Sequence, residues 1–220
     1  MKKLIKSILF GNKPLNRIKF GVSSGMITGY DPGSRSLHLL GLYEREIYSF
    51  LRRAMNKAHV LIDVGANDGY YGLAFLKRQN KQVILCEPGE SKTDLVANLS
   101  LNGLHRDQHY RLVEDFIGSR VSPGTLTLNE LVPADQPTFI LIDVDGGELD
   151  IVEGFRHNSL DRIEWLIETH SLELEQGVMR CLREMGYRCE IISPAWWRLF
   201  VPEQRPLEHN RWLFATKKDK

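Results

Sequence analysis

Short runs of consecutive apolar residues alternate along most of the chain with longer stretches whose apolar residues recur every three or four positions. The first pattern is typical of strands buried on both faces, and the second of amphipathic helices. The expected strands are residues 60–64, 81–87, 110–117, 139–144, 163–167, 187–193 and 211–216, and the expected helices are residues 43–55, 70–76, 91–101, 148–155 and 172–185. Such alternation predicts an α/β fold whose doubly wound, mainly parallel sheet has helices on both faces.

The first 41 residues do not share this alternation. Residues 1–10 interleave three lysines with apolar positions, which suits a short helix that either rests on an anionic membrane surface or packs on the domain. Four glycines and an Asp-Pro-Gly turn then accompany strand-like pieces at residues 26–30 and 37–40, which predicts a hairpin or a covering flap. We therefore expect an N-terminal segment, residues 1–41, and a main domain, residues 42–220.

The turn after the first expected strand combines two glycines with an acidic residue. Gly65 and Gly69 lie between a buried strand and an apolar helix, whose first N–H groups have no partner within the helix. Asp63, just before the turn, suits a cation such as the amino group of an amino-acid-like cofactor better than it suits a pyrophosphate. An ordinary strand-to-helix turn is the alternative interpretation.

Ligands of such sheets bind outside the carboxyl ends of the strands, so polar residues at those ends are the candidates for function. They are Asp63, Glu87, Asp115, Asp143, Asp145, Glu168 and His170. Glu87 follows Gly65 by 22 positions (87 − 65), about the spacing at which an acidic side chain meets ribose hydroxyls, which indicates an adenosine-containing cofactor. A nicotinamide dinucleotide would use the same carboxylate, but the chain lacks the G-x-G-x-x-G turn that binds its pyrophosphate.

The charge and the cysteine content bear on nucleic-acid binding and on the cellular compartment. The 220 residues include 29 basic and 28 acidic side chains, and the net charge of +1 gives no general attraction to nucleic acid. Cys86, Cys181 and Cys189 lie in or beside expected core elements without the spacing of metal ligands. This usage indicates reduced thiols, no disulfide framework and a cytoplasmic protein.

Five segments resemble, in the same order, the motifs of the FkbM-type methyltransferases. They are residues 61–71, 86–88, 98–102, 126–128 and 142–148, and the resemblance extends over residues 43–170. It implies the seven-stranded, Rossmann-like class I methyltransferase fold and S-adenosylmethionine as the methyl donor. It also implies that the acceptor is a hydroxyl of a sugar or another small metabolite.

The resemblance further assigns cofactor contacts to residues at the ends of the first three strands. The methionine end would be lined by Asp63, Gly65, Asn67 and Gly69, the ribose would be bound by Glu87, and the adenine edge would lie near Asp115. The family often has lysine at the position of Leu141 and glutamate at that of Asp145. These departures concern the acceptor rather than the cofactor.

A hydroxyl acceptor must give up a proton to a base during methyl transfer. The candidates for this chemistry are Asp143, Asp145, Glu168 and His170, and His170 is the expected base. Alternatively, Asp143 and Glu168 would hold Mg²⁺, which would orient and acidify the acceptor oxygen. We favour the metal-free route because these carboxylates are scattered along the sequence and form no compact ligand motif.

Two other functions fit parts of the sequence: a nicotinamide-dependent oxidoreductase, and a non-catalytic module that keeps the fold for binding. The missing G-x-G-x-x-G turn opposes the first, and the acidic and glycine positions of the cofactor site oppose the second. Trp196 and Trp197 lie on the connection between the last two expected strands. They would wall the substrate pocket, meet a second subunit or pack in the core.

Overall fold

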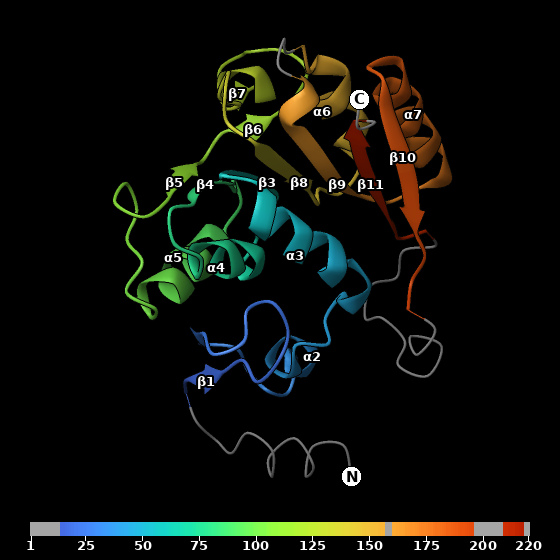
Figure 1. Ribbon diagram of the computed structural model, residues 1–220. Coiled ribbons are helices and arrows are strands. Elements are labelled where there is room, and N and C mark those ends of the chain that lie inside the picture. Colours follow the sequence, from blue (N-terminus) through green and yellow to red (C-terminus); the bar gives the residue numbers. More distant parts are fainter. Residues whose placement is uncertain (1–13, 157–159, 196–208, 218–220) are drawn as a thin grey trace.

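A computed structural model of the protein describes residues 14–156, 160–195 and 209–217. Its centre is a seven-stranded sheet in the order β10-β11-β9-β8-β3-β4-β5 (Figure 1). The strands are β3 (Val60–Val64), β4 (Gln82–Cys86), β5 (Arg111–Val113), β8 (Thr138–Ile142), β9 (Ile163–Thr169), β10 (Tyr187–Ile192) and β11 (Arg211–Lys217). Strands β5, β4, β3, β8 and β9 are parallel to their neighbours, whereas β11 is antiparallel to β9 and β10. This arrangement confirms the predicted fold class.

Helices cover both faces of the sheet (Figure 1). One face carries α3 (Tyr48–Lys57), α4 (Tyr70–Leu76) and α5 (Lys92–Ser100), and the other carries α6 (Glu148–Gly154) and α7 (Leu172–Glu184). Alternate residues of β3 enter the two cores: Leu61 packs with the first group of helices, and Ile62 with the second. All five residues of β3 and of β8 are buried, which explains their unbroken apolar runs.

The strand order reverses at β3, because the chain continues to β4 on one side and later reaches β8 on the other. The loops after β3 and β8 therefore leave the sheet side by side at the point where ligands bind in such folds. A side chain at Gly65 would place its Cβ 1.9 Å from the carbonyl oxygen of Asp143, and Gly65 has φ +82°. The two loops thus touch through their main chains.

Residues 14–47 lie beneath α3 and α4 (Figure 1). They contain a short antiparallel pair, β1 (Asn16–Arg17) and β2 (Ile27–Thr28), and a helix, α2 (Ser36–Leu40), followed by the 3₁₀ turn η1 (Arg45–Ile47). The strand expected at residues 37–40 was wrong, because this piece is helical and ends at Gly41, whose left-handed conformation closes the helix. Ile18 and Tyr30 join the same core as Leu61.

The single strand expected at residues 110–117 was also wrong. The main-sheet strand β5 stops at Val113, and β6 (Phe116–Ile117) pairs in parallel with β7 (Thr125–Leu126) outside the main sheet. At the break, the exposed Glu114 makes ion pairs with Lys92 and Arg106.

Ser91 and Asp94 have the spacing of a capping box before α5, but Ser91 is in a helical conformation and its side chain makes no capping hydrogen bond. A capping box forms instead at Thr127 and Glu130, around η2 (Leu128–Glu130), and a further turn, η3 (Leu160–Arg162), precedes β9.

Residues 1–10 and the Trp196–Trp197 connection lie outside the described residues. None of the helices in the described part of the chain combines the length and hydrophobicity that crossing a membrane requires.

Candidate active site

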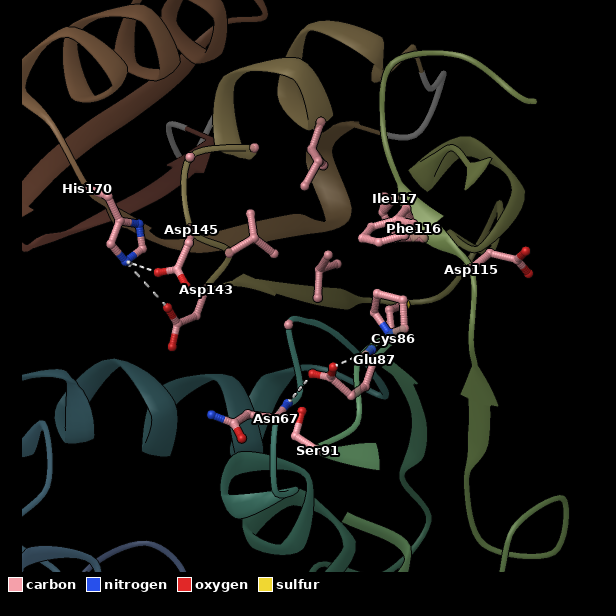
Figure 2. A pocket seen from close by; sticks show the side chains of 18 of the residues that line it. Asn67, Cys86, Glu87, Ser91, Asp115, Phe116, Ile117, Asp143, Asp145 and His170 are labelled. Atoms are coloured by element: carbon pink, nitrogen blue, oxygen red, sulfur yellow. Dashed lines mark hydrogen bonds and ion pairs between the residues drawn. The ribbon is translucent and has the colours of Figure 1, made fainter. Parts of the chain in front are cut away.

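A cavity of about 1070 Å³ opens at the carboxyl ends of β3, β4, β8 and β9. Figure 2 shows three groups of side chains around it: Asn67, Glu87 and Ser91; Asp115, Phe116 and Ile117; and Asp143, Asp145 and His170. Small-molecule sites usually occupy about 300–1,000 Å³. The cavity is therefore large enough for a cofactor together with an acceptor.

Glu87, at the end of β4, is held in place by the main chain. Its Oε2 accepts a hydrogen bond from the N–H of Asn67 at 2.8 Å, and its Oε1 accepts one from the N–H of Gly89 at 2.8 Å (Figure 2). A carboxylate offers about four acceptor positions, so further donors can still bind. Glu87 thus presents a rigid acceptor that suits the two adjacent hydroxyls of a ribose.

Gly65 and Gly69 serve different purposes in the turn. Gly65 lines the cavity, and its lack of a side chain allows the contact with the main chain of Asp143. Gly69 does not line the cavity; it begins α4 with φ +83°, and a Cβ there would lie 3.3 Å from Leu95 on α5. The structure therefore places Gly69 behind the site, where it positions the turn.

Asp63 is a buried carboxyl group directly behind the cavity floor. It is 1% exposed, and neither of its oxygens has a hydrogen-bond partner among the residues that the structure describes. Burial, and then the charges of Asp143, Glu87 and Asp68, raise its pKa to about 8. A cationic group bound at the floor would offset this cost, which is what the ammonium group of an amino-acid cofactor offers.

A third group of cavity-lining residues comes from the break in the expected third strand. Phe116 is 65% exposed and lines the cavity beside Ile117 and Asp115 (Figure 2). An exposed aromatic ring at the rim of a cavity suits a flat apolar ring system. Asp115 was a candidate from the sequence, whereas Phe116 was expected to lie inside a continuous strand.

The acidic group is assembled by strand register. Leu141 of β8 and Leu166 of β9 are paired, so Asp143 and Glu168, each two residues further on, extend from the same face of the sheet. His170 follows, and the imidazole Nε2 lies 3.8 Å from Asp143 Oδ1 and 3.6 Å from Glu168 Oε2. Asp145, 90% exposed at its side chain, lies 3.6 Å from the same nitrogen.

Glu148, the first residue of α6, completes this group and was not among the sequence candidates. Its side chain is fully buried, and its Oε1 accepts a hydrogen bond from His170 Nδ1. Burial lowers the pKa of His170, but the hydrogen bond and charge of Glu148 and the charges of Asp143 and Asp145 outweigh it, so the pKa is raised. The signal for Glu148 was its place at the end of the motif at residues 142–148.

A second contact that the sequence did not indicate joins the N-terminal segment to the turn after β3. Tyr30 Oη donates to Asp68 Oδ1 at 2.9 Å, and Arg35 lies 3.5 Å from the same carboxylate. Asn98 of α5 donates to the Asp68 carbonyl at 3.0 Å. The turn is thereby fixed from two sides.

Comparison with known proteins agrees with this geometry. The family profile of the methyltransferase FkbM domain matches residues 89–189. No curated protein matches the sequence. Solved structures share the fold at low sequence identity, and at these levels they show the fold alone.

Three of these structures illustrate the range. Methyltransferase FkbM from Methylobacillus flagellatus KT has 15% identity and a TM-score of 0.53, and the match covers 72% of this chain but 43% of that protein. An rRNA methylase from Streptococcus thermophilus has 12% identity, a TM-score of 0.54 and coverage of 80% and 98%. A ribosomal protein L11 methylase from Lactobacillus delbrueckii subsp. bulgaricus has 16% identity, a TM-score of 0.53 and coverage of 81% and 80%. The chain thus has the class I methyltransferase fold, and residues 89–189 match the profile of the methyltransferase FkbM domain.

Proposed function

We propose that the protein methylates a hydroxyl group of a sugar or another small metabolite, with S-adenosylmethionine as the methyl donor. The observation that carries this proposal is the chemical contrast between the two ends of one cavity: the fixed acceptor Glu87 at one end, and the acidic group around His170 at the other. The first end suits an adenosine, and the second suits a neutral acceptor that must lose a proton.

The residues behind and around the turn fit the cofactor. Asp63 would pair with its ammonium group, Glu87 would accept hydrogen bonds from the ribose, and Phe116 would pack on the adenine. When bound, the cofactor supplies a methyl group on a positively charged sulfur. The acidic side chains at the floor and at the acceptor end would also favour a ligand that carries positive charge.

The acceptor end favours a hydroxyl over an amine or a nucleic acid. Neighbouring carboxylates would stabilise an amine as its ammonium form, which has no lone pair for attack. The same carboxylates would repel the phosphates of RNA or DNA. A sugar hydroxyl is neutral and can donate a hydrogen bond to Asp143 or to His170 Nε2, which line the cavity.

The proposal is tested in two steps. Calorimetry with S-adenosylhomocysteine first checks the cofactor; retention of NADH but not of S-adenosylhomocysteine would support an oxidoreductase instead. The protein is then incubated with isotopically methyl-labelled S-adenosylmethionine and panels of sugars, amines and RNA. Labelled O-methyl sugar, identified by mass spectrometry and NMR, is the expected product, and labelled amine or RNA alone would overturn the acceptor class.

A further inference from the structure

Three potential metal ligands converge at the acceptor end of the cavity. Asp143 follows β8, Glu168 belongs to β9, and His170 follows β9, and one ligating atom from each lies within 4.8 Å of the others. Asp143 and His170 also line the cavity. An ion held by this group would therefore have open positions on the side where the acceptor binds.

His170 is oriented as metal-binding histidines usually are. In the neutral ring that a metal requires, donation of Nδ1–H to the buried carboxylate of Glu148 leaves the lone pair on Nε2. The side chain is 5% exposed, and Nε2 makes no hydrogen bond within the described ranges. A buried lone pair is thus aimed into the group and has no donor opposite it.

The atoms around Nε2 are carboxylate oxygens, and their distances leave room for an ion. Nε2 lies 3.8 Å from Asp143 Oδ1 and 3.6 Å from Glu168 Oε2, too far for a hydrogen bond. Two ligands each about 2.1 Å from one ion lie about 3.0 Å apart at right angles and about 4.2 Å apart when opposite. The observed separations fall between these limits.

We propose that Asp143, Glu168 and His170 bind a divalent cation that also ligates the acceptor hydroxyl, with Glu148 as the residue that positions His170. This inference rests on the proposed function for its role, but not for the binding itself. A nitrogen ligand beside two carboxylates suits Mn²⁺ or Zn²⁺ better than Mg²⁺, which prefers oxygen ligands throughout. The bound cation would lower the pKa of the acceptor hydroxyl, whose proton would pass to the exposed carboxylate of Asp145 and then to water.

The binding is tested without turnover. The full chain is treated with EDTA, dialysed and titrated with Mn²⁺, and binding is followed by calorimetry and by the electron paramagnetic resonance signal of free Mn²⁺. We expect one ion per chain. We expect at least tenfold weaker binding in Asp143→Asn and in Glu168→Gln, and about 10–100-fold weaker binding in Glu148→Gln.

Glu173→Gln is the matched control, because Glu173 is an exposed carboxylate in the first turn of α7, close to the site in sequence but outside it. It should bind Mn²⁺ as the unchanged chain does. S-adenosylhomocysteine binding is measured on every variant to show that each is folded. A chain that binds S-adenosylhomocysteine but neither Mn²⁺ nor Zn²⁺ would overturn the cation site, and so would unchanged affinity in both Asp143→Asn and Glu168→Gln.

The two proposals fail separately. If the chain binds Mn²⁺ through these residues but transfers no methyl group to any hydroxyl, the cation site stands and the proposed acceptor class is wrong. If it O-methylates a sugar with full rate in EDTA and shows no Mn²⁺ binding, the proposed function stands and the cation site is wrong.

Discussion

The two ends of the cavity use carboxylates in opposite ways. At the cofactor end, both oxygens of Glu87 accept hydrogen bonds from main-chain N–H groups at 2.8 Å. At the acceptor end, His170 Nε2 faces three carboxylate oxygens at 3.6–3.8 Å and no hydrogen-bond donor among the described residues. The Glu87 carboxylate is thus held by main-chain donors before a ligand binds, whereas the carboxylates near His170 Nε2 lie beyond hydrogen-bond distance of that nitrogen.

The side chains at the two ends are ordered by different interactions. Main-chain donors fix Glu87 before any ligand arrives, so the cost of ordering it falls on folding rather than on binding. The carboxylates around His170 repel one another, and a bound proton, ammonium group or cation would reduce this repulsion. The two ends should therefore respond differently to mutation: one through affinity for the cofactor, the other through turnover.

The largest effect should come from breaking the junction between the two ends. In Gly65→Ala the new Cβ would lie 1.9 Å from the Asp143 carbonyl oxygen, and the residue would keep φ +82°. Gly103→Ala is the control, because Gly103 has φ +72° but nothing within 4 Å of its Cβ position. Chemical denaturation should show a loss of about 1 kcal/mol in the control and of about 3 kcal/mol or more beyond that in Gly65→Ala. Equal losses would mean that the two loops do not need their contact.

His170→Ala should separate turnover from cofactor affinity. The side chain lies at the acceptor end, so its loss should lower kcat by about 10²–10⁴-fold and leave S-adenosylhomocysteine affinity nearly unchanged. The exposed His59→Ala serves as the control for loss of an imidazole. Full activity of His170→Ala would move the chemistry to positioning alone or to another residue.

Glu87→Gln should act at the opposite end. The amide keeps one oxygen acceptor but turns an NH₂ donor toward a main-chain N–H, so S-adenosylhomocysteine affinity should fall by about 1–3 kcal/mol. Calorimetry measures the change, and Glu90→Gln, an exposed neighbour, should bind normally. If a folded Glu87→Gln chain binds with undiminished affinity, the ribose assignment is wrong.

The smallest change should come from Asp63, and it has opposite signs for stability and binding. Because the folded pKa is raised to about 8, the folded chain holds a proton that the unfolded chain loses near pH 4, so stability falls as pH rises between these values. Asp63→Asn removes this penalty and should raise the unfolding free energy at pH 8 by about 1 kcal/mol or more. The same variant should bind S-adenosylhomocysteine more weakly, because it cannot become a carboxylate.

Asp135→Asn is the control, because Asp135 is an exposed carboxylate; it should change neither the unfolding free energy nor the affinity for S-adenosylhomocysteine.

Proton release on ligand binding tests the charge of Asp63 in the unchanged chain. Pairing with an ammonium group requires the charged form of Asp63, so binding at pH 7 should release protons. Calorimetry in buffers of different ionisation enthalpy measures this release, and its absence would remove the ammonium assignment.

The sequence predicted those parts of the fold that local pattern decides. Strand Val60–Val64 and helix Tyr70–Leu76 were predicted to the residue, because full burial and helical spacing leave unambiguous patterns. The break after Val113, where Glu114 pairs with Lys92 and Arg106, leaves no mark in the local pattern of apolar residues. Residues 37–40 carry an apolar run too short to distinguish strand from helix.

In the candidate site, too, the sequence predicted what depends on local pattern and topology but not what depends on tertiary packing. Residues at strand ends were found because parallel topology brings carboxyl ends together. Glu148 was missed because it begins a helix, and only the packed structure shows that its side chain turns back toward His170 and is fully buried. Phe116 was missed because its exposure follows from the break in the strand.

The close approach of the Gly65 and Asp143 main chains has a consequence for how such a site can change its acceptor substrate. This main-chain contact, which requires glycine at position 65, sets the spacing of the two ends whatever side chains line them. Under the proposed function, substitutions at the exposed Asp145 would change the acceptor end without changing the span that the two loops set. The contact between the two loops would keep the distance between the methyl group and the acceptor constant while the acceptor itself changes.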